Sequence, residues 1–492
     1  MPYKTPILIA CLLFASVMSY AAQTRASDNY NTWITEGKRG IQQQKQGFQT
    51  FKDEADRQFI GFLKAQWKAY DAFNGNVRDP KPKPVRIPKA PTIVEKNPVL
   101  ITPTAQKILI REKPSGTGIK IEQAVTQGAH YVVGFFGKDL SYSTIKYPKL
   151  DLKNNVSNTL ISDFWTAVSK SNADIHHKQL QQYRDSLQLT DWGYLLLVNE
   201  LGKRIYATSP QGQVLFNWYM LLKAGFNARI AYNSYNIYLL IRSHQKLYAT
   251  EYIAINGKQH YLIQLENKRV KMGRVFTYEG DYPGALKSLD LEVKPMPMFS
   301  NKHTQRKLSF AYGKNKYVIH TRYNKYLIDY LRTYPDLDLA FYLNSGVDNT
   351  IGNNLLDEFR YIIKGKSTTE AAELLLRFVQ TGFTYQTDKQ QFGRENYLFI
   401  EETLYYPASD CEDRVVLYAW LVKNLLGLEL IGLKYPGHVA TAVLFEQEVK
   451  GEKIIFNGKK YTIADPTYIN ANLGMEMPSL KGKKRTIISY SQ

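Results

Sequence analysis

The sequence predicts an α+β protein with more than one domain, and three observations lead to this class. The chain has 492 residues, which exceeds what one ordinary hydrophobic core organises. Apolar residues recur every three or four positions in several segments, as they do in helices that pack on a core. Short apolar runs flank the Asn-Gly pairs at Asn256 and Asn457, which is typical of β-hairpins.

The residue pattern of positions 1–22 predicts a signal peptide. They contain a lysine, an apolar run of about a dozen residues and the small-residue pattern Ser19–Ala21. The segment Leu8–Cys11 also fits the pattern that precedes a lipid-modified cysteine, but the apolar run continues past Cys11, so simple export ranks ahead of lipid anchoring. No later run reaches the roughly twenty apolar residues of a spanning helix. We therefore expect an exported protein, periplasmic or extracellular, without a transmembrane segment in the mature chain.

Residues 23–78 predict an N-terminal helical arm, and residues 79–115 predict a linker. From Gly40 to Phe73 the apolar positions recur mostly at threes and fours, which indicates an amphipathic helix or a pair of helices. The following segment has eight prolines with Lys and Arg between them. Proline at this density excludes a regular helix, so the segment is expected to be extended.

Residues 116–285 and 286–492 predict two further domains of mixed helices and strands. The patterns expected to form helices lie at 157–169, 214–224, 352–363 and 368–381, and strand-like residues lie at 308–321. The segment 411–468, near the end of the chain, contains the candidate catalytic residues, which are a cysteine, a histidine and an aspartate.

The charge balance indicates the kind of partner. A formal net charge of +20 favours attraction to an acidic surface or partner. The basic residues are dispersed, however, and no aromatic-interleaved basic module of a nucleic-acid-binding class is present, so no nucleic-acid partner is expected. HExxH, paired CxxC and GxxxxGK[ST] motifs are absent, and His176 and His177 have no matching ligands nearby. We expect no cofactor and no metal requirement.

Cys411 is the only cysteine after the predicted signal peptide, since the chain has two and the other is Cys11. It lies in the stretch PASDCEDR, where Ser409 or Asp410 offers an N-cap oxygen and an apolar run follows. Cys411 is therefore expected in the first turn of a buried helix, where unpaired N–H groups and the helix dipole stabilise a thiolate. The neighbouring acids oppose this, so a cationic partner is needed, and histidine is the natural candidate.

His438 begins a buried strand, predicted at residues 438–445, after a Tyr-Pro-Gly turn. A hairpin is expected between residues 453–456 and 461–464, and Asp465 follows directly. If the second hairpin strand pairs antiparallel with the His438 strand, Asp465 lies beside His438. This pairing requires residues 453–456 to lie on the outer side of the sheet. A nucleophile, a base and an orienting carboxylate then come together.

The three segments SDCEDRVVLYAWLV, YPGHVATAV and YTIADPTY resemble the transglutaminase-like superfamily of papain-like cysteine hydrolases. The order Cys, His, Asp on a helix, a strand and a second strand matches the core of that family. The resemblance is strong over about Ser409 to Tyr468 and diffuse over the helices before it. It implies Cys411 as nucleophile, His438 as general base and Asp465 as the orienting carboxylate. It also implies a transglutaminase-like catalytic domain at 286–492.

The activity that the resemblance implies is that of an exported cysteine peptidase or amidase acting on protein or peptide substrates through a thioester acyl-enzyme. Water as the acceptor gives hydrolysis, which we favour because no feature that disfavours water is evident. A lysine amine as the acceptor gives a cross-linking transamidase, and a binding or scaffold protein that inherited the fold is the third reading. The oxyanion is expected at the Cys411 backbone N–H, with Gln391 or Tyr405 as candidate side-chain donors.

Residues 116–285 predict a degenerate copy of the same fold. The segment from Ser209 aligns with the segment from Ser409, each with an apolar helix, a glycine, a strand and an Asn-Gly turn. In this alignment Cys411, His438 and Asp465 are replaced, in that order, by Gln211, Asn236 and Leu265. The first copy is then expected to lack the chemistry and to cover or shape the cleft of the second, or to bind substrate.

Overall fold

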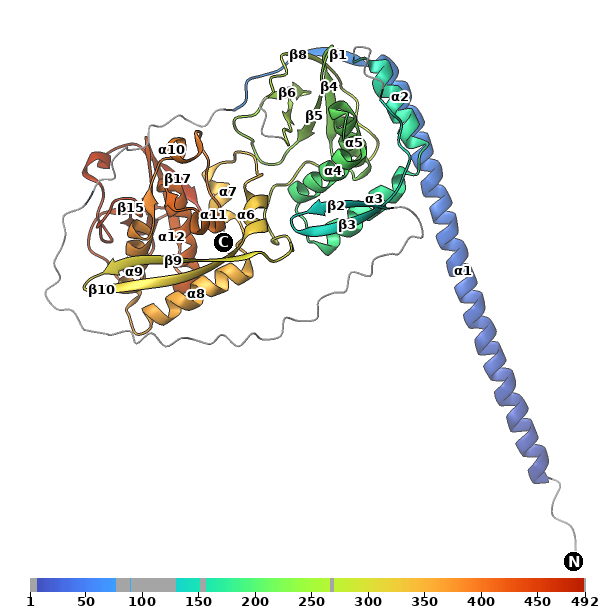
Figure 1. Ribbon diagram of the computed structural model, residues 1–492. Helices are drawn as coiled ribbons and strands as arrows, with labels where there is room; N and C mark the ends of the chain where they lie inside the picture. The colour runs from blue at the N-terminus through green and yellow to red at the C-terminus, as the bar shows by residue number, and fades with distance from the viewer. Residues whose placement is uncertain (1–6, 77–88, 90–129, 151–155, 266–269, 491–492) are drawn as a thin grey trace, which may run out of the picture. The chain divides into compact units, whose positions relative to one another are not determined.

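The computed structural model describes residues 7–76, 89, 130–150, 156–265 and 270–490 (Figure 1). The predicted linker at 79–115 lies outside the described residues except for Lys89, and the side chains of the whole predicted signal peptide, 1–22, are also outside them. The described elements are mixed helices and sheets, which confirms the α+β class. None of the helices among the described residues combines the length and the apolar character needed to cross a membrane.

The N-terminal part is a single helix, α1 (Ile7–Ala65), and it forms a compact unit separate from residues 66–492. The sequence-based prediction of helix as far as Phe73 is wrong beyond Ala65. Residues Trp67–Asp71 form β1, which pairs antiparallel with β8 (Arg274–Tyr278). The Trp67 ring packs edge-on against Tyr278, with ring centroids 5.2 Å apart. Pairing and ring packing outweigh a helical spacing that these few residues satisfy only by chance.

The first mixed region begins with a hairpin and four helices. The elements are β2 (His130–Phe135), β3 (Lys138–Ser143), α2 (Asn158–Ser169), α3 (Ala173–Ser186), α4 (Asp191–Ile205) and α5 (Pro210–Lys223). Four further strands complete the region, namely β4 (Ala228–Tyr232), β5 (Ile237–Arg242), β6 (Tyr252–Ile255) and β7 (Lys258–Leu262). With β1 and β8 they form a six-stranded sheet in the order β1-β8-β4-β5-β7-β6.

The second mixed region begins with the long hairpin of β9 (His303–Tyr312) and β10 (Asn315–Asn324), which lies against α8 (Asn349–Ile363) and α9 (Thr368–Thr381) (Figure 1). Its helices are α6 (Lys325–Leu331), α7 (Leu339–Asn344), α8 (Asn349–Ile363), α9 (Thr368–Thr381), α10 (Asp388–Phe392), α11 (Ile400–Tyr405), α12 (Cys411–Leu426) and the 3₁₀ turn η1 (Pro478–Leu480). Its remaining strands are β11 (Thr384–Tyr385), β12 (Ala408–Ser409), β13 (Leu430–Tyr435), β14 (His438–Val443), β15 (Lys453–Phe456), β16 (Lys459–Ala464) and β17 (Thr486–Ser489).

The two main sheets have the same strand order. The second sheet runs β15-β16-β14-β13-β17, and the first runs β6-β7-β5-β4-β8 with β1 added at its edge. Every neighbouring pair in both sheets is antiparallel. In the first sheet helix α5 directly precedes strand β4, and in the second sheet helix α12 directly precedes strand β13. The predicted division at residue 285 stays a prediction, because residues 66–492 form one compact unit.

Helix α12 is the centre of the second region. Its residues from Cys411 to Val422 are all buried, because α9, β14, α11, α7 and α8 pack around it. An apolar sequence on almost every face is what such a position requires. Gly427 ends the helix in the left-handed conformation (φ 66°), which a residue without a side chain adopts at no steric cost.

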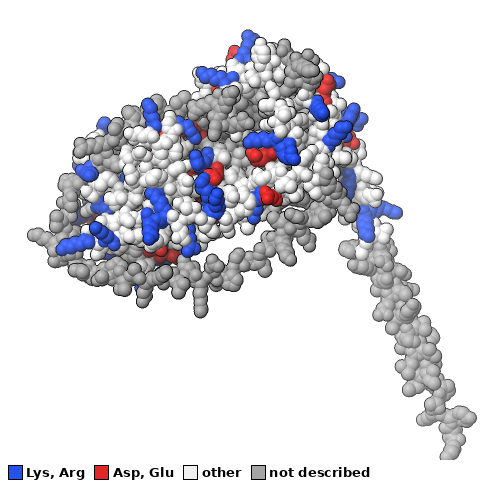
Figure 2. Space-filling model, in the orientation of Figure 1, with Lys and Arg blue, Asp and Glu red and all other residues white. Residues whose placement is uncertain are grey.

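The positive charge is spread over the surface. Figure 2 shows Lys and Arg side chains dispersed over this face of the described residues, with fewer acidic side chains between them. No single basic patch dominates this view. The distribution agrees with a generally basic surface, as the dispersed sequence positions suggested.

The central place of α12 leads to a stability prediction. Leu417 is fully buried in α12, and Leu417→Ala should lower the free energy of unfolding by about 2–5 kcal/mol through lost burial and a residual cavity. Ile455 on β15 is 71% exposed, so Ile455→Ala should change it by less than about 0.5 kcal/mol. Urea unfolding followed by tryptophan fluorescence measures both. Equal effects would contradict the central packing of α12.

Candidate active site

Cys411 is the first residue of α12, and Asp410 is the residue that caps this helix. The backbone N–H of Asp410 donates to Asp413 Oδ2 at 3.1 Å, which closes the first turn. The Cys411 side chain is only 1% exposed. Its thiol donates a hydrogen bond to Glu412 Oε2 at 2.9 Å. The sequence predicted the helix start at Cys411, but it did not predict that the thiol contacts its own neighbour.

His438 and Asp465 are brought together by the pairing of two strands. β14 and β16 pair antiparallel, with Thr441 opposite Ala464, and β15 lies on the outer side of β16. The beginning of β14 therefore meets the residue that follows β16. His438 Nε2 lies 2.8 Å from Asp465 Oδ2, and both residues are buried. The predicted strand order and the predicted contact are both confirmed.

The Asp465 carboxylate is held on both oxygens. Oδ2 faces the imidazole, and Oδ1 accepts hydrogen bonds from the backbone N–H groups of Thr467 (2.9 Å) and Tyr468 (3.0 Å). This Asx turn is typical of an aspartate that precedes a tight loop. Thr441 Oγ1 also donates to the Ala464 carbonyl at 2.6 Å, which ties β14 to the strand end just before Asp465. The carboxylate thus has a single orientation.

The electrostatic environment raises the pKa of His438. Burial alone lowers this pKa, but the negative charge of Asp465, its hydrogen bond to the ring and the charge of Glu412 together outweigh burial. Because Nε2 faces Asp465, the other ring nitrogen, Nδ1, is the one available for proton exchange. Nδ1 is buried and makes no hydrogen bond within the described part of the chain. A buried imidazole arranged in this way can act as a general base.

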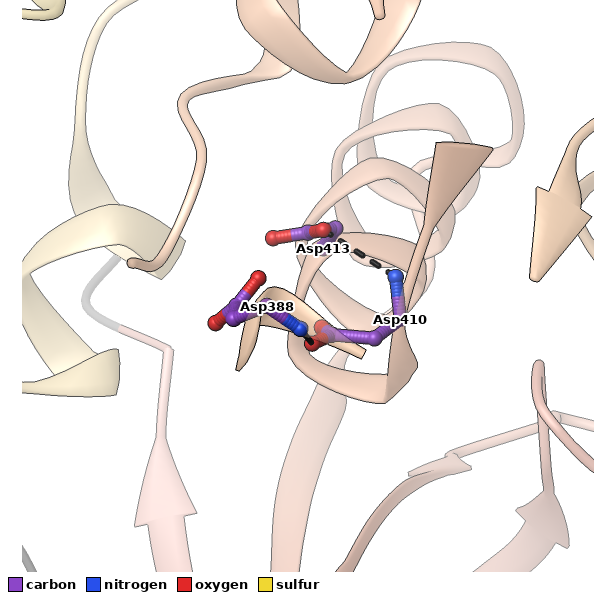
Figure 3. A group of neighbouring side chains, drawn as sticks. All are labelled: Asp388, Asp410 and Asp413. Atoms are coloured by element: carbon purple, nitrogen blue, oxygen red, sulfur yellow. Dashed lines mark hydrogen bonds between the residues drawn. The ribbon is translucent and has the colours of Figure 1, made fainter. Parts of the chain in front are cut away.

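Three buried aspartates surround the start of α12. Figure 3 shows Asp388, Asp410 and Asp413 close together. One carboxylate oxygen of each lies within 4.8 Å of the others. Each accepts a backbone hydrogen bond: Asp388 N–H donates to Asp410 Oδ2 (3.3 Å), Asn396 N–H to Asp388 Oδ2 (2.8 Å) and Leu398 N–H to Asp413 Oδ1 (3.0 Å). These contacts connect α10 and the loop after it to the start of α12. Sequence reasoning missed Asp388, because no local pattern around it indicates a contact with the start of α12.

Arg414 is a buried cation that interacts with two of these aspartates. It is fully buried in the first turn of α12, and burial lowers its pKa to about 10 while Tyr385, Asp410 and Asp413 act in the opposite direction. A guanidinium with this pKa stays charged at neutral pH. It partly balances the aspartates at the start of α12.

The two candidate oxyanion side chains lie in different surroundings. Tyr405 on α11 packs edge-on against the rings of Tyr323 and Tyr406. Gln391 lies on α10, and its Nε2 is buried with no hydrogen-bond partner among the residues that the structure describes. A buried donor without an acceptor is the property expected of an oxyanion donor, so Gln391 stays the better candidate.

The first sheet has apolar residues at the positions that correspond to His438 and Asp465. Ile237 pairs with Tyr232 across β4–β5 as His438 pairs with Tyr435 across β13–β14. Ile263 follows Leu262 at the end of β7, as Asp465 follows Ala464 at the end of β16. The sequence alignment that proposed Asn236 and Leu265 is therefore wrong by one and two residues. The loop between the paired strands is longer in the first sheet, which accounts for the difference at Asn236.

The helix start in the first region also differs. Ser209 caps α5 and Pro210 is its first residue, the place that Cys411 takes in α12. Gln211 is the next residue, and its side chain reaches toward the Tyr235 carbonyl at 3.5 Å. No thiol, imidazole or carboxylate is present at the three corresponding positions.

Comparisons with protein-family models, with curated proteins and with solved structures gave no match to this chain.

The His438–Asp465 contact predicts a pH-dependent effect on stability. Asp465→Asn should lower the His438 pKa, because it removes the charge that raises it. A raised folded-state pKa contributes stability that is present below the ordinary value of about 6.5 and is lost as pH rises through the folded value. The stability lost in Asp465→Asn, on the order of 1–3 kcal/mol, should therefore be largest below about pH 6.5.

Urea unfolding at several pH values and an NMR titration of labelled histidine measure this effect. The chain has eight histidines, so His438→Ala identifies the His438 signal by its absence. Asp357→Asn, at an exposed acid on α8, is the matched control. A pH-independent difference between the wild type and Asp465→Asn would contradict the charge contribution.

The Cys411–Glu412 contact predicts a shift in thiol reactivity. Glu412→Gln removes a negative charge beside the sulfur, so the thiolate should form at a lower pH, by about one unit. Iodoacetamide labelling of Cys411 across pH 5–9, quantified on its peptide by mass spectrometry, reads this directly. Glu358→Gln, which removes a glutamate beside His320, is the control. Superimposable profiles for Glu412→Gln and the wild type would show that the carboxylate does not act on the thiol.

Proposed function

We propose that this protein is an exported cysteine hydrolase of the transglutaminase-like kind that acts on peptide or amide bonds. The observation that carries the proposal is the 2.8 Å contact between His438 Nε2 and Asp465 Oδ2, where two neighbouring strands meet in a sheet that packs on the helix of Cys411. An isolated buried histidine or a turn aspartate is common. Their pairing beside a sheet that covers the helix of the single thiol in residues 23–492 supports a catalytic arrangement.

The acylation step assigns a role to each group. His438 Nδ1 takes the proton of the Cys411 thiol, and the thiolate attacks the substrate carbonyl carbon. The backbone N–H of Cys411, at the positive end of α12, stabilises the oxyanion. The C–N bond then breaks, the amine leaves with the proton from His438, and a thioester forms. Asp465 keeps the ring oriented and stabilises its charged form.

Deacylation repeats the sequence with water. His438 removes a proton from water, hydroxide attacks the thioester carbon, and the carboxylic acid leaves as the Cys411 sulfur regains a proton. The imidazole, rather than Glu412, is assigned as the base in both steps, because Asp465 orients the ring and raises its pKa. A lysine amine in place of water would give an isopeptide bond and a cross-linking transamidase.

The first region is proposed as a catalytically inactive copy of the same fold. The shared strand order of the two sheets supports a common architecture, and the apolar residues Ile237 and Ile263 at the two corresponding positions support the loss of chemistry. Its role in this proposal is to shape the cleft or to bind substrate.

One observation favours a second candidate function. The Cys411 thiol is nearly sealed from solvent and donates to a carboxylate, which is the arrangement of an unreactive thiol. A binding or scaffold protein that kept the fold would show this feature. The two candidates differ in whether the thiol is needed.

Activity measurements on point variants separate these candidates. Release of fluorescent fragments from labelled casein, and of ammonia from a glutamine peptide, should fall by on the order of 10⁴-fold in Cys411→Ala and His438→Ala. His320→Ala, at an exposed histidine, should leave both rates unchanged. A wild-type chain without activity whose thiol labels only above about pH 8 would support the scaffold function. Incorporation of cadaverine faster than ammonia release by water would replace hydrolysis with transamidation.

A further inference from the structure

Gln380 makes an unusual set of contacts near the C-terminal end of α9. Its side chain is buried, with 1% exposed. Its amide nitrogen donates toward three backbone carbonyls, those of Asp465 (3.0 Å), Tyr468 (2.9 Å) and Ala471 (3.0 Å). All three belong to the loop that follows β16. One side chain thus contacts three points in the first part of this loop, between Asp465 and Ala471.

The orientation of the Gln380 amide is set by a neighbouring arginine. Arg377 Nη1 donates to Gln380 Oε1 at 3.0 Å, and a guanidinium has no acceptor, so the amide oxygen must face it. The same nitrogen donates to Asn470 Oδ1 at 3.0 Å, and Nη2 donates to Asn472 Oδ1 at 3.0 Å. The amide NH₂ therefore points at the loop carbonyls. Arg377 binds the same loop through the side chains of Asn470 and Asn472.

The loop held by Gln380 determines where the Asp465 carboxylate points. Asp465 Oδ1 accepts from the backbone N–H groups of Thr467 and Tyr468, so the carboxylate turns with this backbone. Gln380 binds the carbonyls of Asp465 and Tyr468, which are the two ends of that turn. A shift of the turn would move Oδ2 away from His438 Nε2.

The backbone of Gln380 connects the same point to the nucleophile's helix. Arg414 Nη1 donates to the Gln380 carbonyl at 3.1 Å, and Nη2 donates to the Phe383 carbonyl at 3.0 Å. Arg414 Nε donates to Ser409 Oγ at 3.2 Å, just before Cys411. Arg414 is three residues after Cys411 in the first turn of α12. Gln380 therefore contacts the Asp465 loop through its side chain and the Cys411 helix through its carbonyl.

We propose that Gln380 is a positioning residue that keeps Asp465, and through it His438, aligned with the helix that carries Cys411. This inference rests on the proposed function for its catalytic meaning. Its geometric part concerns only the orientation of the His438–Asp465 pair. Buried hydrogen-bonded groups that orient a functional side chain commonly affect activity without touching the substrate.

The test uses Gln380→Met in the full chain, because methionine has a similar shape but cannot donate to the three carbonyls. The His438 pKa, measured by NMR with labelled histidine, should fall toward its value in Asp465→Asn. Labelling of Cys411 by iodoacetamide at acidic pH should weaken with it. If the wild type hydrolyses casein, kcat should fall by about 10²-fold with KM little changed, as expected for a small misplacement.

Two further variants make the outcome decisive. Gln179→Met removes a partly buried glutamine that binds Ser143 in the first region, and it should leave the His438 pKa unchanged. Arg377→Gln, at the less buried end of the network, should move the His438 pKa in the same direction by a smaller amount, and it serves where Gln380→Met does not fold. Lower thermal stability with an unaltered His438 pKa in both Gln380→Met and Arg377→Gln would overturn the proposal and leave Gln380 a structural residue.

The proposed function and this inference fail in distinguishable ways. A wild-type chain without hydrolase or transamidase activity overturns the function, whereas the His438 pKa still reports the orientation of the pair. Activity lost in Gln380→Met with an unchanged His438 pKa overturns the positioning role and leaves the function standing.

Discussion

The antiparallel pairing of β14 with β16 is the constraint on which the candidate site depends. It brings together His438 and Asp465, which are 27 residues apart in the chain, and it does so only in one register. A shift of one residue would turn every side chain of the strand to the opposite face of the sheet. The burial of both strands makes such a shift costly. The outer position of β15 and the packing of α12 on β14 then follow from the same sheet.

Much of this arrangement was predictable because it depends on local patterns. The apolar run after Cys411, the capping residue before it and the Asn-Gly turn at Asn457 each determine an element over a few residues. The hairpin of β15 and β16 then brings Asp465, at the end of its second strand, to the strand that begins at His438. The contact of His438 with Asp465 followed from these elements alone.

The features that the sequence did not reveal depend on tertiary contacts. Trp67 and its neighbours have helical spacing but pair with β8, which lies more than 200 residues later in the chain. Asp388 reaches the start of α12 from a separate short helix, and Gln380 binds a loop that begins 85 residues after it. No pattern of a few residues encodes such a meeting. The hydrogen bond from Cys411 to Glu412 also depends on side-chain conformation, which spacing does not determine.

The two sheets have the same strand order, but only the second has a buried imidazole–carboxylate pair at the positions compared above. A buried imidazole and carboxylate lose their hydration, and their mutual attraction only partly compensates for this loss. At the corresponding positions of the first sheet, Ile237 and Ile263 are buried with no such cost. The second sheet contains the more costly pair. A costly buried pair at one of two corresponding places supports the role that the proposed function gives it.

The near-complete burial of Cys411 has a kinetic consequence. A substrate carbonyl cannot approach a thiol that is 1% exposed unless the surrounding side chains first move apart. Under the proposed function, the frequency of that opening would set an upper limit on turnover, whatever the speed of the bond-breaking step. If the protein has the proposed activity, this conformation is a latent one, and whatever widens the approach to α12 would control the rate.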